Sequence, residues 1–320
     1  MRRPLPFLLS VLLSAMVVAG PTAGISAAAN APTSGLPRIE RIMLAGRVPL
    51  LVVPRKTLPV VTLTVMVPGG SSLDPADKPG LAALVGTMMT RGIRGLGAAE
   101  LDDRLDGIGA SLEAETDKDR ILIRFTGLSR DLALGLELVA GMLAEPALDP
   151  EEFVRERDQR LASLRSTMDD ANALSGLAAD MHDFGDHPYA HPAQGTRSGL
   201  GALVIEDLRG FHARHIRPGS VTLVAVGDVG ANELRTALEG RLKTWLALGE
   251  APRSGLPAPR LRAGKSVLLV DTDVNQSYIQ LDLPSVPRHH PDHLPLAVMT
   301  YILGGSSRGR LYQDIRDRQG

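Results

Sequence analysis

The sequence contains no cysteine, and only 3% of its residues are aromatic. Without cysteine the chain can form no disulfide bond, has no thiol nucleophile and cannot bind zinc through thiolates. Its formal net charge is −1, which provides no positive field for nucleic acid or acidic membranes. The shortage of aromatic rings also argues against a surface on which bases stack. We therefore expect no nucleic-acid partner.

The composition that remains is that of an ordinary globular protein, with 44% hydrophobic and 22% charged residues. The length of 320 residues suggests two domains, or one domain and part of a second. Because aromatic side chains are scarce, alanine, leucine, valine and glycine must fill most of the core.

Residues 1–31 are typical of a signal peptide. Arg2 and Arg3 provide a charged start, and the apolar run Phe7–Ala19 is too short to span a bilayer comfortably. The small residues of Ala27–Ala31 provide a cleavage site, and a retained membrane anchor is the alternative. No later run is long enough for a transmembrane helix. We therefore expect export to a bacterial periplasm, with no stable membrane insertion after cleavage.

The region after the signal alternates strand-like and helix-like segments. Val60–Val67 is rich in β-branched residues and predicts a strand, which Gly69 and Gly70 end. Gly80–Thr90 predicts a helix packed on a sheet, and the alternating pattern of Ser111–Phe125 predicts a hairpin.

A long charged helix is expected to begin at Pro150, because Asp149 suits the N-cap and proline suits the first helical position. On this pattern residues 32–248 form a first domain and the proline-containing stretch 249–263 is a linker. Residues 264–320 then start a second domain, with strands expected at 266–270 and 277–283.

The two domains share an order of strand, loop and helix. Val60–Val67 and Leu81–Met89 correspond in this order to Ser277–Leu283 and Leu294–Ile302. The match predicts a duplicated α/β domain. A second copy that stopped at Gly320 would lack strands and leave open sheet edges, so we expect the sequence to be a fragment of a longer protein.

Four segments, taken in order, resemble the pitrilysin/insulinase family of zinc metallopeptidases, which includes the mitochondrial processing peptidases and the core subunits of the respiratory bc1 complex. The segments are Gly69–Ala82 with Asp74-Pro75, the stretch from His187-Pro188-Tyr189 to Gly195-Thr196, Pro218–Val229, and the glycine-rich Leu303–Gly320. The resemblance implies an α+β fold. It consists of a duplicated α/β domain of the mitochondrial-processing-peptidase type, a mixed sheet with helices on one face, with the second copy truncated.

The family's catalytic helix carries His-x-x-Glu-His, in which two imidazoles one turn apart bind zinc and the glutamate activates a water molecule. A glutamate from a later helix is the third ligand. The resemblance aligns the two histidines with Ala83 and Thr87, the general base with Gly86 and the distal glutamate with Ser163. All four roles are vacant, so we predict no catalytic residue, no metal ligand and no cofactor.

The sequence also predicts structural roles for two of these residues. A helical threonine such as Thr87 usually bonds to its own backbone or packs by its methyl group. Gly86 is expected to permit close packing where the zinc ligands would have stood.

Three groups of histidines could in principle bind a metal instead, but no second shell of carboxylates is evident and we expect no metal role. The groups are His182, His187 and His191; His212 and His215; and His289, His290 and His293.

The resemblance implies a peptidase-family subunit that is inactive alone and pairs with an active zinc peptidase homologue around a peptide chamber. Family members bind the substrate backbone at a sheet-edge strand near the zinc helix. The candidate segments are Leu63–Gly70 and Tyr278–Leu283, with ordinary paired strands as the alternative. The candidate residues are Val65, Val67, Gly69, Gly70, Tyr278 and Gln280.

Two other functions stay open. The chain could be an active zinc metalloendopeptidase with atypical ligands, or a structural assembly subunit like the respiratory core proteins. In two-subunit bacterial members the silent subunit contributes an arginine and a tyrosine from its second domain, and those positions would follow Gly320.

Overall fold

The structure is a computed structural model that describes residues 37–45, 47–251, 255–260, 264–272 and 277–320. The predicted signal peptide, residues 1–31, lies outside the described residues. Among the helices that the structure describes, none combines the length and the apolar character needed to cross a membrane.

The main feature is a six-stranded mixed sheet with the order β1-β2-β8-β3-β7-β6. Only β2 and β8 pair in parallel, and the other neighbours are antiparallel. The central strand β3 therefore has a partner on each side, while β1 and β6 are the edges. The strands are β1 Glu40–Leu44, β2 Val48–Pro54, β3 Val60–Pro68, β6 Ser111–Thr116, β7 Arg120–Leu128 and β8 Thr222–Gly227.

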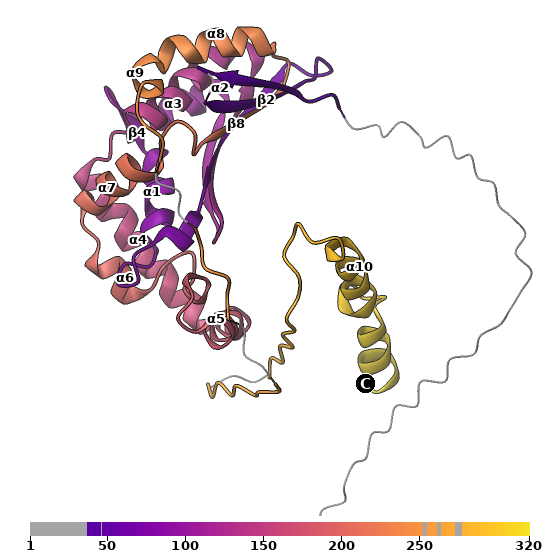
Figure 1. The fold of residues 1–320 in the computed structure, drawn as a ribbon. Helices are drawn as coiled ribbons and strands as arrows, with labels where there is room; N and C mark the ends of the chain where they lie inside the picture. Colours follow the sequence, from indigo (N-terminus) through magenta and orange to yellow (C-terminus); the bar gives the residue numbers. More distant parts are fainter. Residues whose placement is uncertain (1–36, 46, 252–254, 261–263, 273–276) are drawn as a thin grey trace, which may run out of the picture. The chain divides into compact units, whose positions relative to one another are not determined.

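Helices cover one face of this sheet (Figure 1). Alternate residues of β3 are buried under them, among them Val61, Val65 and Val67, whereas Thr62 and Thr64 on the other face are half-buried. This alternation is the period of two expected of a strand with one covered face. The confirmed architecture is α+β, a mixed sheet with helices on one face.

The helices reach the sheet at different strands: α1 contacts β6 and β7, α3 contacts β3 and β7, and α8 contacts β1 and β2. The helices are α1 Leu81–Met89, α2 Ala98–Ile108, α3 Leu132–Ala144, α4 Pro150–Asp169, α5 Ala171–Phe184, α6 Arg197–Ala202, α7 Ile205–His215, α8 Ala231–Arg241, α9 Lys243–Leu246 and α10 His293–Gly304. Shorter elements are β4 Gly92–Ile93, β5 Leu96–Gly97, η1 Gly70–Leu73, η2 Ser129–Asp131, η3 Pro188–Ala190 and the π-helical η4 Tyr312–Arg318.

The predicted start of α4 is confirmed. The side chain of Asp149 accepts hydrogen bonds from the backbone N–H groups of Glu151 and Glu152 at 2.8 and 3.0 Å, and Pro150 occupies the first turn. Proline fits there because its missing N–H would have no helical partner.

The start of α1 is held by a side chain from the preceding loop. Asp74 accepts hydrogen bonds from the backbone N–H groups of Gly80 and Ala82, both at 2.7 Å. Gly80 has a φ of 102°, and a Cβ there would lie 2.8 Å from the Cα of Gly195. Burial raises the pKa of Asp74 to about 7 and outweighs the opposing backbone hydrogen bonds.

The strands expected at 266–270 and 277–283 are not formed in the described residues of those segments, although helix α10 is present. The prediction was wrong there because a strand needs a neighbour to satisfy its backbone groups, and these segments have none in the described chain. Val267 and Ile279 are 93% and 87% exposed. Tyr278 and Gln280 therefore do not lie in a strand.

We expect the buried Asp74 to make stability depend on pH. Its pKa is about 7 in the folded protein against an ordinary 3.8, so folding favours the protonated carboxyl group. This contribution to stability is complete at pH values below the ordinary pKa and is lost as the pH rises through the pKa of the folded protein. The free energy of unfolding of the unmodified protein should therefore fall relative to that of Asp74→Asn across this range, by roughly 1–4 kcal/mol. Urea unfolding at a series of pH values measures this, and curves that stay parallel would contradict it.

Candidate functional site

Ala83 and Thr87 lie one turn apart on the same side of α1. Thr87 Oγ1 is 3.2 Å from the carbonyl oxygen of Ala83 and donates a hydrogen bond to it. The threonine thus bonds to its own helix, as the sequence predicted. Ala83 is buried, with an exposed fraction of 2%, and Thr87 is half-buried.

Gly86 lets α1 lie directly on the hairpin of β6 and β7. A Cβ at this position would lie 2.9 Å from both Ile121 Cγ2 and Thr116 Oγ1. Real Cβ atoms almost never come this close, so a side chain here would force the helix and the hairpin apart. The predicted role of Gly86 in close packing is confirmed.

Arg160 of α4 contacts this helix turn. Its Nη2 donates to Thr87 Oγ1 at 2.8 Å and lies 3.5 Å from the carbonyl oxygen of Ala83, and its Nη1 donates to Gln194 Oε1. Ser163, which was aligned with the distal ligand, is exposed on α4. In the described structure, α4 therefore places a guanidinium group, and not Ser163, against Thr87.

A second arginine, Arg91, forms ion pairs with the nearby carboxylates. Arg91 lies within 3.2 Å of Asp102, 3.3 Å of Glu156 and 3.6 Å of Glu152, and so connects the end of α1 with α2 and α4. Burial lowers the pKa of Arg160, and the negative charge of Glu156 opposes this shift. Arginine stays positively charged under all ordinary conditions.

The residues present do not fit zinc. Zinc in proteins takes imidazole, thiolate or carboxylate ligands, whereas this turn offers the hydroxyl group of Thr87 and a main-chain carbonyl group. The permanent positive charge of Arg160 would also repel a divalent cation. Elsewhere, the described residues contain no cluster of three or more histidine, aspartate or glutamate side chains arranged for a metal.

Two of the histidines named from the sequence make hydrogen bonds to backbone groups. His187 Nδ1 accepts from the N–H of Tyr189 at 3.1 Å, and its Nε2 donates to the carbonyl group of Pro257 at 2.9 Å. His212 Nε2 lies 3.1 Å from the carbonyl oxygen of Met142. Burial lowers the pKa of His212, which favours the neutral ring.

Strand β3 is not a sheet edge over Leu63–Met66, so the predicted peptide addition is wrong at Val65. Val67, Gly69 and Gly70 lie beyond the pairing with β8, and peptide binding there stays a prediction. Strand β3 pairs with β7 along its whole length and with β8 over Val61–Met66, which includes Val65. The N–H of Gly69 donates to the carbonyl group of Asp119 at 2.5 Å. The hairpin turn also crowds Gly70, where a Cβ would meet a backbone oxygen at 2.1 Å.

The edge strand beside α1 is β6. It pairs only with β7 in the described sheet, and its Ser111, Glu113 and Glu115 are exposed. Its last residue, Thr116, is buried against Gly86. The sequence predicted this hairpin, but the strand order that makes β6 an edge depends on pairing between distant segments.

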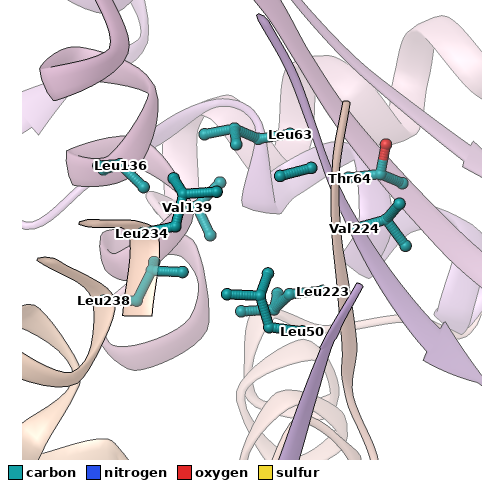
Figure 2. Close-up of a pocket in the computed structure, with 10 residues that line it drawn as sticks. Leu50, Leu63, Thr64, Leu136, Val139, Leu223, Val224, Leu234 and Leu238 are labelled. Atoms are coloured by element: carbon teal, nitrogen blue, oxygen red, sulfur yellow. The ribbon is translucent and has the colours of Figure 1, made fainter. Parts of the chain in front are cut away.

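A small apolar recess lies between the sheet and helices α3 and α8. Figure 2 shows Leu136, Val139, Leu234 and Leu238 from the helices and Leu50 and Leu63 from the strands around it. The core residues that line it are almost completely buried. We interpret it as a packing gap in the core, because no charged side chain lines it.

Comparison with known proteins gives a consistent family. The insulinase model (peptidase family M16) matches residues 51–182, and the model of the peptidase M16 inactive domain matches residues 202–320. An uncharacterized zinc protease from Streptomyces coelicolor is 27% identical over 89% of this chain and 63% of its own length. The non-peptidase homolog YmxG from Helicobacter pylori is 24% identical over 86% of this chain and 63% of its own length. The chain therefore spans about three fifths of the length of these relatives.

Solved structures share the fold. A peptidase M16 inactive domain from Pseudomonas fluorescens superposes with a TM-score of 0.75 at 22% identity, and the match covers 88% of this chain and 68% of that one. The periplasmic protease PqqL from Escherichia coli gives a TM-score of 0.63 at 17% identity over 68% of this chain and 25% of its own.

We expect Gly86→Ala to destabilise the protein by roughly 1–3 kcal/mol, because the added methyl group would overlap Ile121 and Thr116. Alanine is intrinsically better than glycine in a helix by about 1 kcal/mol, so the loss would oppose the helix propensity. The matched control is Gly210→Ala in α7, where nothing lies within 4 Å of an added Cβ. Chemical denaturation should show the control to be neutral or stabilised. Equal stability of the two variants would contradict the packing argument.

Proposed function

This chain belongs to the M16 (insulinase) family of peptidases, and we propose that within this family it is a non-catalytic subunit. It pairs with an active zinc peptidase homologue to form a heterodimer and contributes one wall of a chamber that holds a peptide or unfolded protein substrate. The proposal includes export to the periplasm and the absence of a cofactor.

The observation that carries this proposal is the contact between Arg160 and Thr87, at 2.8 Å. The resemblance puts a zinc ligand at position 87, and here a guanidinium group from α4 contacts that residue. A guanidinium group donates hydrogen bonds but cannot accept a lone pair or lower the pKa of a bound water molecule as zinc does. The turn therefore lacks the means to generate a metal-bound nucleophile.

The substrate-holding part of the proposal relies on β6. An edge strand presents unpaired backbone N–H and C=O groups that can pair with an extended peptide. In the described sheet β6 is such an edge, and α1 packs beside it. We propose that the substrate backbone adds to β6, in place of the paired part of the segment Leu63–Gly70 named from the sequence.

The relatives support a family with both kinds of members. One is called a zinc protease and another a non-peptidase homolog, and one structural neighbour is described as a periplasmic protease. Because the chain spans about three fifths of its curated relatives, pairing, chamber formation and substrate are all parts of the proposal.

We expect the purified chain to bind no stoichiometric zinc and to cleave no peptide by itself. Elemental analysis and a peptidase assay measure this, both alone and in a complex recovered by pull-down from periplasm. Activity of the complex should require the partner's metal and be lost with a chelator. Stoichiometric zinc together with chelator-sensitive cleavage by this chain alone would show an active enzyme with atypical ligands. A recovered assembly without any peptidase activity would favour the structural subunit.

Binding of a peptide to β6 should depend on the peptide's backbone N–H groups. In an added strand, alternate N–H groups point toward the edge. We expect N-methylation of one alternate set to weaken binding about tenfold or more, because several hydrogen bonds worth roughly 1 kcal/mol each are lost. N-methylation of the other set, with the same side chains, is the matched control. Fluorescence anisotropy measures the affinities, and equal weakening by both sets would contradict strand addition.

A further inference from the structure

The guanidinium group of Arg160 is a half-buried cation held by neutral acceptors. Its contacts are the hydroxyl group of Thr87, the carbonyl group of Ala83 and the side-chain oxygen of Gln194. Within the described residues no carboxylate lies at ion-pair distance from it. Its Nε and one proton of Nη1 also have no acceptor among the described groups. The guanidinium group is therefore held in position and still has N–H groups that can donate to a ligand.

The carboxylates around this arginine are engaged elsewhere. On α4, Glu156 lies 3.3 Å from Arg91, and Glu152 pairs with Arg91 and Arg155. From α2, Asp102 also pairs with Arg91, at 3.2 Å. Glu156 still favours the charged state of Arg160 from beyond ion-pair distance. Glu156 would therefore repel an incoming anion that Arg160 attracts.

A buried cation without a counter-ion is costly, and its desolvation is recovered when an anion binds it with hydrogen bonds. Burial is also the largest influence on the pKa of this guanidinium group, which it lowers. Carbonyl and hydroxyl acceptors recover only a part of the lost hydration, since charged acceptors make hydrogen bonds about twice as strong. A carboxylate is therefore the ligand that this group favours.

Arg160 contacts α1 one residue away from the point where this helix packs on the proposed peptide strand. Its acceptor Thr87 follows Gly86 in the chain, and Gly86 packs on Thr116, the last residue of β6. A peptide laid along β6 would pass or end at this point.

We propose that Arg160 binds a carboxylate of the peptide held on β6, so that the subunit prefers acidic or carboxyl-terminal segments. This inference rests on the proposed function, because it requires a peptide on that strand. The carboxylate comes either from an aspartate or glutamate side chain or from the peptide's C-terminus.

The test measures binding of labelled, extended, valine- and threonine-rich peptides to the full chain by fluorescence anisotropy. One pair of peptides differs only in a C-terminal acid or amide. A second pair, both amidated, differs only in glutamate or glutamine at an internal position. We expect about a tenfold preference for the carboxylate in at least one pair, and the responding pair identifies the source. The preference should shrink at high salt because the interaction is between charges.

The variants separate a binding role from a structural one. Arg160→Gln should lose the preference, and Arg160→Lys, which keeps the charge, should retain part of it. Arg165→Gln removes an exposed arginine from the same helix and should leave the preference unchanged. If Arg160→Gln does not fold, Arg160→Lys and the salt dependence of the unmodified protein decide the question.

The outcomes distinguish the two proposals. Peptides that bind with the expected dependence on backbone N–H groups, but without a preference for the carboxylate, would overturn the role of Arg160 and leave the proposed function standing. A preference that Arg165→Gln abolishes as fully as Arg160→Gln would also overturn it. Failure of all four peptides to bind would overturn both.

Discussion

The arrangement of the site depends on the direct contact between α1 and the hairpin of β6 and β7. This contact requires a residue without a side chain, and Gly86 provides it beside Ile121 and Thr116. The helix is also held at its start, where Asp74 accepts two backbone hydrogen bonds of 2.7 Å. Because the helix is fixed at its start and along one side, the residues on its other side have defined positions. Thr87 can then accept a hydrogen bond from a neighbouring helix.

That hydrogen bond shows how two helices can be joined without a metal. The resemblance assigns ligands of one zinc ion to α1 and to a later helix, and such an ion would join the two. Here Arg160 of α4 joins them through Thr87 and Ala83. Coordination bonds are replaced by hydrogen bonds, which suit attraction of an anion but not ionisation of water. The chemistry that the turn can perform has changed, while the link between α1 and α4 is retained.

The limits of prediction from sequence are clear at three places. The β-branched run that forms β3 was recognisable, but its central position was not, because β8 lies far away along the chain. Alignment indicated Ser163 on α4, whereas the direction of each side chain decides that Arg160 reaches α1. The strand pattern at 277–283 was real in the sequence, yet no strand forms there, since a strand requires a partner.

The sequence by itself determined the family resemblance, the local elements and the loss of imidazole and carboxylate at positions 83, 86 and 87. It could do so because turn residues, helix caps and residue types act over a few positions of the chain. Only the tertiary structure decided that β6 is the edge next to α1 and that a guanidinium group stands against Thr87. Both depend on segments that are distant in sequence, and their contact is set by packing of the whole domain rather than by any local pattern.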